Sequence, residues 1–287
     1  DLVWNRLHTL NFERFTGPID VYHSSDWAQA PSKAFNVTTV HDLAPFKFPK
    51  LTPKSVVSTH TARFKRLAQE IDRVIVPSEA TKKDLVEIGM DEGKIRVIYE
   101  APGDTFKPQS QEVVSGLLKK FKVSGDYLLA VGVGGRKNTD RLVKAFELAR
   151  AGKNLNLILV GTGGEEYTEN RGVRALGAVG DRDLATLYTG AQAFIYPSLY
   201  EGFGLPILQA FACGAPVVTS NLSAMAETAG TAAVLVDPDS TESISDGIKK
   251  ALAGRVGLAK KGFERVKSFS WEKAAIETLA VYREAKK

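Results

Sequence analysis

The sequence predicts an α/β protein of two domains, each built around a parallel β-sheet. Short apolar runs alternate with helical patterns along the 287 residues, which is typical of repeated βαβ units. The runs are almost continuously apolar, as expected for strands that helices cover on both faces. A chain of this length fits two domains of ordinary size.

In the first half we expect strands at 20–23, 37–40, 73–76 and 95–99. Apolar residues from Val57 to Ile71 share one helical face. Ser78 fits the N-cap of a helix over 79–88, which Gly89 would end. Segment 1–15 is amphipathic and lacks the strand and glycine-rich turn that normally open such a domain. We therefore expect an incomplete first domain with an exposed sheet edge.

In the second half the expected strands are 127–131, 155–160, 193–196, 216–219 and 233–236. Two prolines and a glycine in 100–110 indicate a linker. We expect a partial first domain over 1–105 and a second domain over 106–268. A C-terminal helix over 269–287 is expected to return to the first domain.

The composition is that of a globular protein, with 44% hydrophobic and 25% charged residues. No apolar run is long enough to cross a membrane, and we recognise no secretory signal, although the chain starts at Asp1 instead of a methionine. Cys213 is the only cysteine and lies in an apolar run, so it fits a buried residue in a reducing cytoplasm. We expect a cytoplasmic protein.

The net charge of +5 suits an anionic ligand and is too small to indicate nucleic acid. We interpret the local basic stretch as solvated helix faces. Peripheral association with the inner membrane face is kept as a minority interpretation. The stretch comprises Arg63, Lys65, Arg66, Arg73, Lys82 and Lys83.

The most informative motif is Tyr-Glu-Gly-Phe-Gly-Leu-Pro at 200–206, between an expected strand and an apolar helix. Its glycines allow a close approach of the backbone, and the N-terminus of the following helix favours a phosphate. Glu201 would repel that phosphate, so we expect it to accept hydrogen bonds from sugar hydroxyls. The structural alternative is a glycine-rich turn with an exposed glutamate.

Two further glycine-rich turns follow strands of the same expected sheet. Gly-Val-Gly-Gly-Arg-Lys-Asn at 132–138 would place two cations where a diphosphate leaving group could be neutralised. Gly-Thr-Gly-Gly at 161–164 is a tight turn. Each is weak evidence alone, but the carboxyl ends of parallel strands lie at one edge, so the three turns should converge on one crevice.

His41 follows a strand of the first half and should face an inter-domain cleft; a core histidine satisfied by Asp42 or by the backbone is an equal alternative. Two acidic clusters, 181–183 and 237–240, fit helix N-termini better than metal sites. The other histidines show no metal-ligand spacing.

Together these residues resemble the retaining GT-B glycosyltransferases of family four. The resemblance covers nearly the whole chain. It rests on Val40-His41-Asp42-Leu43, Val76-Pro77-Ser78-Glu79, Arg136-Lys137-Asn138, Gly161-Thr162-Gly163, Glu201-Gly202-Phe203-Gly204-Leu205-Pro206 and Ser268-Phe269-Ser270-Trp271. It implies two Rossmann-like domains facing across a cleft.

The resemblance also implies roles for single residues. Arg136 and Lys137 would hold the diphosphate, Glu201 the donor sugar, and His41 would lie by the transferred sugar. Gln209 would contact the ribose and Val179 would lie near the base. The implied catalytic residues are His41, Glu201, Arg136 and Lys137, and the implied donor-binding residues are Gly134, Gly135, Thr162, Gly163, Val179, Gly202, Phe203, Gly204, Leu205 and Gln209.

The implied reaction is the metal-independent, cofactor-free transfer of a hexose, with mannose as a candidate, from a GDP-, UDP- or ADP-sugar to a glycan or lipid-linked acceptor. The sequence lacks the paired-carboxylate arrangement of a glycosidase. The family has a second glutamate where this chain has Gln209, and an amide offers one acceptor oxygen where a carboxylate offers two. The alternative is a non-catalytic nucleotide-sugar-binding fragment or remnant that is completed by another chain. A dinucleotide oxidoreductase is disfavoured because Gly-x-Gly-x-x-Gly with a following acid is absent.

Overall fold

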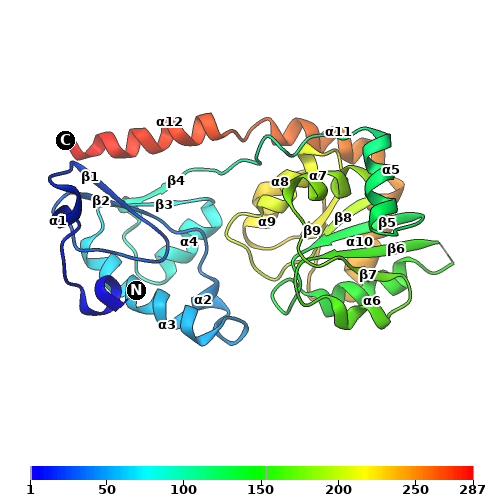
Figure 1. Cartoon of the computed structure of the whole chain (residues 1–287), viewed down its shortest axis with the longest axis horizontal. Coiled ribbons are helices and arrows are strands. Elements are labelled where there is room, and N and C mark those ends of the chain that lie inside the picture. The colour runs from blue at the N-terminus through cyan, green and yellow to red at the C-terminus, as the bar shows by residue number, and fades with distance from the viewer. Residues whose placement is uncertain (1, 153, 287) are drawn as a thin grey trace. The chain divides into compact units, whose positions relative to one another are not determined.

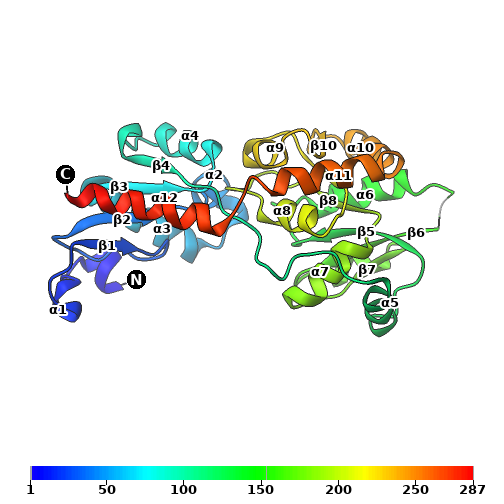
Figure 2. The same cartoon turned by 90° about the horizontal axis from the view of Figure 1, so that it is seen from above.

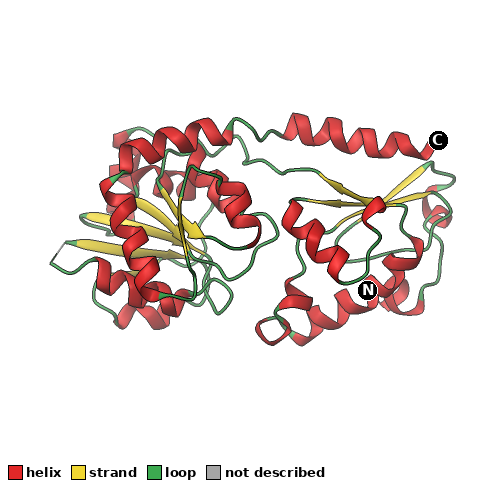
Figure 3. Cartoon of the chain, turned by 180° about the vertical axis from the view of Figure 1, so that it is seen from behind, coloured by secondary structure: helices red, strands yellow, loops and turns green. Residues whose placement is uncertain are grey.

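A computed structural model describes residues 2–152 and 154–286. The chain divides into two compact units. Unit 1 comprises Asp1–Glu100 and Trp271–Lys287, and unit 2 comprises Ala101–Ser270. Each unit contains one fully parallel sheet with helices on both faces (Figures 1 and 3), as the alternation of apolar runs predicts.

The sheet of unit 1 has four strands in the order β1-β2-β3-β4. These are β1 (Val21–Ser24), β2 (Phe35–Thr39), β3 (Arg73–Val76) and β4 (Ile95–Val97). Its helices are α1 (Glu13–Thr16), α2 (Ala44–Lys47), α3 (Lys54–Glu70), α4 (Glu79–Glu87) and α12 (Trp271–Tyr282), with a π-helix at Leu2–Leu7. Ser78 Oγ accepts the backbone N–H of Thr81, so the expected N-cap of α4 is confirmed.

Helix α12 packs on the sheet of unit 1 although the whole of unit 2 separates them in sequence (Figure 2). Ala274 and Val281 join a buried cluster with strand residues Val37 and Ile75. Just beyond the helix, Glu284 forms ion pairs with Arg73 at 2.5 Å and Arg96 at 3.0 Å. The core of unit 1 therefore combines strands of its first segment with the later helix α12.

The sheet of unit 2 has six strands in the order β10-β9-β8-β5-β6-β7. They are β5 (Asp126–Val131), β6 (Leu155–Val160), β7 (Val173–Ala175), β8 (Ala193–Tyr196), β9 (Val217–Ser220) and β10 (Val234–Val236). Its helices are α5 (Gln111–Lys120), α6 (Thr139–Ala149), α7 (Asp181–Gly190), α8 (Leu205–Ala212), α9 (Ser223–Ala229), α10 (Thr241–Ala253) and α11 (Arg255–Val266). The acidic clusters lie at the start of α7 and just before α10, as expected.

Alternate residues of the central strands of unit 2 point to opposite layers. Leu128 and Leu157 pack in one buried cluster with Phe146 of α6 and Ile248 of α10. On the other face, the Tyr127 hydroxyl donates to the carbonyl of Leu187 in α7 at 2.7 Å. This two-sided burial explains why the strands lack polar alternation.

Candidate active site

The three glycine-rich turns of unit 2 meet at the carboxyl edge of neighbouring strands β8, β5 and β6. A Cβ atom on Gly161 would lie 3.3 Å from the Cα atom of Gly132, so these two turns are in close contact. The backbone N–H of Leu199 donates to the carbonyl of Arg136 at 2.9 Å, which joins the turn after β8 to the turn after β5. The sequence correctly predicted this convergence.

Asn138 fixes the turn that carries the two cations. It adopts a left-handed conformation with φ of 61° directly before α6, which asparagine tolerates better than most residues. Its buried Nδ2 donates to the carbonyls of Pro197 at 3.1 Å and Pro238 at 2.7 Å. The turn is therefore tied to the segments that follow β8 and β10.

Glu201 lies between the two cations. Its Oε1 accepts from Lys137 Nζ at 2.6 Å, and its Oε2 accepts from Arg136 Nη1 at 3.1 Å. Lys137 also donates to the hydroxyl of Tyr196 at 2.8 Å, and Arg136 donates to the carbonyl of Tyr200 at 2.7 Å. Glu201 is only 9% exposed. It is therefore a buried partner of the cations, and the alternative of an exposed glutamate is wrong.

The charges of this cluster control its protonation. Burial alone would raise the pKa of Glu201, but the positive charges of Lys137 and Arg136 outweigh burial and hold that pKa below its usual value. Burial, reinforced by the nearby carboxylate of Glu201, raises the pKa of Tyr196. At neutral pH Glu201 is therefore a carboxylate and Tyr196 a neutral phenol.

The turn 200–206 is held rigidly at the start of α8. Gly204 precedes the helix with φ of 92°, in the left-handed region that favours glycine. Two hydroxyl groups hold backbone carbonyls of the same turn. Thr228 Oγ1 donates to Phe203 O at 2.6 Å, and Ser223 Oγ donates to Glu201 O at 3.1 Å. Gly204 offers no side chain to cap α8, so the helix start suits an external anion.

The other residues that we expect from the sequence to bind the donor lie around these turns. The backbone N–H of Gly161 donates to Gly177 O at 2.8 Å, which brings the turn of Thr162 and Gly163 beside the segment of Val179. Thr162 and Gly163 are exposed, whereas Gln209 on α8 is half-buried. Gly134 and Gly135 lie in the same turn as Arg136.

His41 of unit 1 follows β2, and its Nδ1 lies 2.8 Å from Glu100 Oε1. The hydrogen bond to Glu100 raises the pKa of His41, although burial opposes this. The imidazole is 57% exposed, so the alternative of a core histidine satisfied by Asp42 is wrong.

Two members of the basic stretch do not lie on solvated helix faces. Arg73 begins strand β3 and pairs with Glu284, and Arg63 is a buried residue of α3. The Arg63 side chain is 3% exposed and bonds Asp26 Oδ1 at 2.9 Å. Its guanidinium also donates to Thr38 Oγ1 at 2.5 Å. Sequence reasoning missed this pair because Asp26 lies 37 positions away and only the fold brings it close. It also missed Tyr196, whose signal is a hydroxyl at the end of an otherwise apolar strand.

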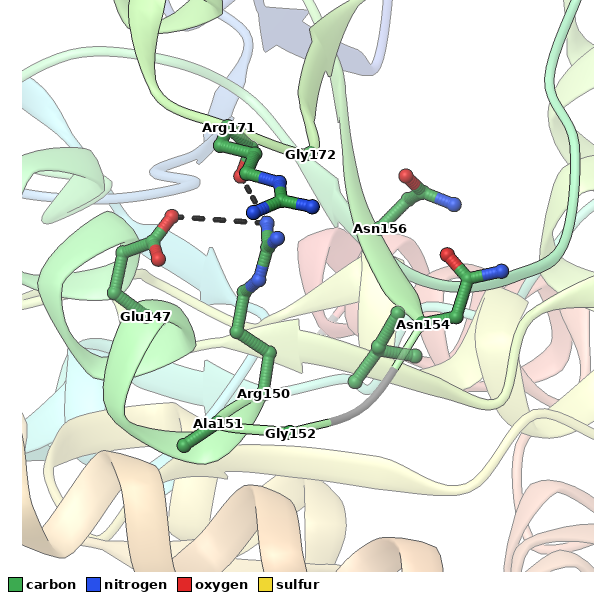
Figure 4. Close-up of a pocket in the computed structure, with 9 residues that line it drawn as sticks. Glu147, Arg150, Ala151, Gly152, Asn154, Asn156, Arg171 and Gly172 are labelled. Atoms are coloured by element: carbon green, nitrogen blue, oxygen red, sulfur yellow. Dashed lines mark hydrogen bonds and ion pairs between the residues drawn. The ribbon is translucent and has the colours of Figure 1, made fainter.

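A separate cavity of about 640 Å³ lies at the amino ends of strands β6 and β7 of unit 2. Figure 4 shows Arg150 beside Arg171, with Glu147, Asn154 and Asn156 around them. Arg150 donates to the carbonyl of Arg171, and Glu147 Oε1 lies 3.8 Å from Nη1 of Arg150. The cavity is thus at the opposite end of the sheet from the Glu201 cluster.

Two kinds of feature are absent from residues 2–152 and 154–286. No helix in them is long and apolar enough to cross a bilayer. No group of three or more histidine, cysteine or acidic side chains among the same residues is arranged to hold a metal ion.

Both halves of the chain match known protein families. Residues 3–101 match the family described as Glycosyltransferase Family 4, and residues 125–254 match Glycosyl transferases group 1. The chain is 30% identical over 281 residues to O-antigen chain mannosyltransferase B of Escherichia coli, covering 92% of this chain and 74% of that protein. The chain belongs to glycosyltransferase family 4.

Other relatives of this glycosyltransferase carry similar names. It is 29% identical to O-antigen chain mannosyltransferase RfbU of Salmonella typhimurium, over 74% of this chain and 59% of that protein. It is 26% identical to the serotype-specific mannosyltransferase WbdA of Escherichia coli but spans only 28% of that protein's length.

Solved structures identify the fold as GT-B. Sucrose-phosphate synthase from Thermosynechococcus elongatus superposes with a TM-score of 0.76 at 23% identity, over 95% of this chain and 75% of that one. HepE from Anabaena in complex with UDP-glucose gives 0.72 at 18% identity, over 88% and 72%. The expected fold class is confirmed, and the glycosyltransferase is a transferase enzyme by family.

Proposed function

We propose that this glycosyltransferase moves a hexose, with mannose as the first candidate, from a nucleotide-diphosphate sugar to a glycan or lipid-linked acceptor with retention of configuration. The observation that carries the proposal is the pair of cations, Arg136 and Lys137, held by Glu201 beside the uncapped start of α8. Mannose is favoured because O-antigen mannosyltransferases are among the relatives.

The arrangement suits departure of a diphosphate. In the proposed reaction the bond between the sugar C1 atom and the phosphate oxygen breaks, and C1 bonds the acceptor oxygen. The acceptor's proton passes to the leaving phosphate. Arg136 and Lys137 would stabilise the charge that develops on that leaving group.

Donor binding would exchange the partners of Glu201. A diphosphate carries more negative charge than one carboxylate and would attract both cations. The carboxylate of Glu201 could then accept hydrogen bonds from hydroxyls of the donor sugar, as expected from its place in the turn. Gln209 would contact the ribose and Val179 the region of the base. His41 would lie by the transferred sugar.

A ligand screen tests the donor half. We expect GDP-mannose, UDP-glucose or ADP-glucose to raise the melting temperature of the intact chain, since a ligand that binds only the folded state stabilises it. Lys137→Ala should abolish the shift, whereas Lys250→Ala removes an exposed cation on α10 and should preserve it. Stabilisation by none of the three would refute the proposal.

Product analysis tests the transferase half. Incubation with the stabilising donor and mannose oligosaccharides should give a product whose new linkage keeps the donor's anomeric configuration, measured by NMR. An inverted product would contradict the retaining mechanism. Donor binding without transfer or hydrolysis would favour the alternative of a nucleotide-sugar-binding fragment.

A further inference from the structure

Trp27 lies at the carboxyl end of β1 in unit 1 and is 56% exposed. Its ring meets His60 of α3 edge to face, with centroids 5.0 Å apart. His60 is buried, so Trp27 has a fixed neighbour on one side and solvent on the other. Ligands of open parallel sheets bind outside the carboxyl ends of the strands, which is where this ring lies.

The turn that carries Trp27 is held in one conformation. Asn5, which is 1% exposed, donates from Nδ2 to Trp27 O at 2.7 Å, and its Oδ1 accepts the backbone N–H of Gln29 at 2.8 Å. The backbone N–H of Trp27 donates to Ser25 Oγ at 3.3 Å. An aromatic ring on a fixed turn loses little entropy on binding and is therefore preorganised.

A polar network surrounds Asp26, which precedes Trp27 in the chain. Asp26 accepts from Arg63 at 2.9 Å and from the backbone N–H of His41 at 3.4 Å. The Asp26 side chain is 16% exposed, so it is not fully closed off from solvent. An exposed ring and a partly exposed carboxylate on consecutive residues combine a stacking surface with a hydrogen-bond acceptor.

The same region contains buried polar groups that stability alone does not explain. Gln29 is 0% exposed, and neither its Nε2 nor its Oε1 has a hydrogen-bond partner in the described structure. Arg63 Nε is also buried without one. A buried polar group without a partner destabilises the fold, and natural proteins keep such local conflicts mainly at functional sites.

Trp271 is a useful contrast within the same unit. It is 52% exposed, but it lies at the start of α12, where no ring contact is recorded among the described residues. Single exposed aromatic residues are ordinary on protein surfaces. Trp27 differs because Asn5 holds its backbone turn and because the preceding residue, Asp26, is a partly exposed carboxylate.

We propose that Trp27 is the stacking platform of a subsite for a pyranose ring of the acceptor glycan, with Asp26 accepting from its hydroxyls. This inference rests on the proposed glycosyltransferase function. A pyranose has one face of C–H groups that packs on an aromatic ring, while hydroxyls at its edge need hydrogen-bond partners. Trp27 and Asp26 supply both types of contact side by side.

Calorimetric titration of the intact chain with α-mannobiose and cellobiose, at saturating nucleoside diphosphate, tests the subsite. We expect one of these disaccharides to bind, Trp27→Ala to weaken it at least tenfold, and Trp27→Phe to keep most of the affinity. Trp271→Ala is the matched control and should bind normally. Binding of neither sugar, or equal binding by wild type and Trp27→Ala, would overturn the proposal.

The nucleotide titration run on the same variants separates this proposal from the proposed function. Trp27→Ala is expected to bind the nucleoside diphosphate with wild-type affinity. If the nucleotide binds and the disaccharide binds wild type and Trp27→Ala equally well, only the subsite is refuted. If the wild type does not bind the nucleotide at all, the proposed function is refuted instead. If Trp27→Ala prevents nucleotide binding while folded, the ring belongs to the donor site and the acceptor subsite is wrong.

Discussion

Glu201 Oε1 lies 2.6 Å from Lys137 Nζ, at the point where a donor phosphate is proposed to bind. The same carboxylate also pairs with Arg136 at 3.1 Å. A buried carboxylate that neutralises both cations competes with any incoming anion. The affinity of the proposed donor site for an anion should therefore depend on the charge of Glu201.

Glu201→Gln is expected to tighten the binding of GDP or UDP without a sugar by about three- to tenfold, because the competing charge is removed while the shape is kept. Affinity for the complete nucleotide sugar should gain less, since the proposed hydroxyl contacts weaken. Calorimetry with both ligands measures the difference. Glu264→Gln, on the exposed side of α11, is the control. Weaker GDP and UDP binding by Glu201→Gln would contradict the competition.

The stability contributed by Glu201 is expected to depend on pH. The folded state holds its pKa below the ordinary value of 4.5, so ionised Glu201 stabilises the fold above pH 4.5. That contribution is lost as the pH falls through the lowered pKa. The melting temperature of Glu201→Gln should therefore lie below that of the wild type at pH 7 and approach it in acid. A gap that widens in acid would show the opposite sign.

Gln209→Glu is expected to strengthen donor binding by about 1–2 kcal/mol, because a carboxylate accepts from both ribose hydroxyls with charge assistance. This corresponds to roughly 5- to 30-fold in affinity. Gln209→Ala, at the same position, removes the side-chain contact and so distinguishes the effect of a gained contact from the effect of a change in packing. Titration with the donor identified by the ligand screen measures both. If Gln209→Glu binds no better than the wild type, the ribose contact is wrong.

The protonation of His41 is expected to follow Glu100. The hydrogen bond to Glu100 raises the pKa of His41, so Glu100→Gln should lower that pKa toward the ordinary 6.5. Because the folded pKa is raised, the favourable interaction is present below pH 6.5 and lost as pH rises through the folded value. Titration of the imidazole C–H resonance by NMR measures the shift. An unchanged His41 pKa in Glu100→Gln would remove Glu100 as the cause.

Two helical glycines should respond oppositely to alanine. A Cβ atom on Gly247 in α10 would overlap the Val236 side chain and lie 3.1 Å from Val218, so Gly247→Ala should cost about 1–3 kcal/mol. Gly257 in α11 is exposed with no atom within 4 Å of such a Cβ, so Gly257→Ala should gain up to about 1 kcal/mol of helix propensity. Thermal unfolding of both variants measures the contrast, and equal effects would contradict it.

The apolar runs predicted strand positions well, because two-sided burial leaves a clear signal. Strands β3, β6 and β8 begin and end where the sequence predicts. Strand β7 was missed because Val-Arg-Ala at 173–175 is short and not apolar throughout. Its pairing with β6, not its composition, makes it a strand.

The grouping of the cations with the glycine-rich turns was predictable from strand ends, but their partners were not. Sequence reasoning assigned Glu201 to sugar hydroxyls and missed its ion pairs with Arg136 and Lys137, which lie 65 and 64 positions away. The run of basic residues predicts a solvated Arg63, because the sequence alone does not show which member of such a run is buried. Such pairings depend on tertiary contacts that local patterns do not encode.

The place of α12 in the core of unit 1 has a consequence for synthesis on the ribosome. Ala274 and Val281 must be translated before the cluster around Val37 and Ile75 can close. Unit 2 is one continuous segment that is finished earlier. We therefore expect unit 2 to fold first during translation. Until α12 has been made, residues 1–100 leave an apolar face of their sheet uncovered, and we expect chaperones to protect that face.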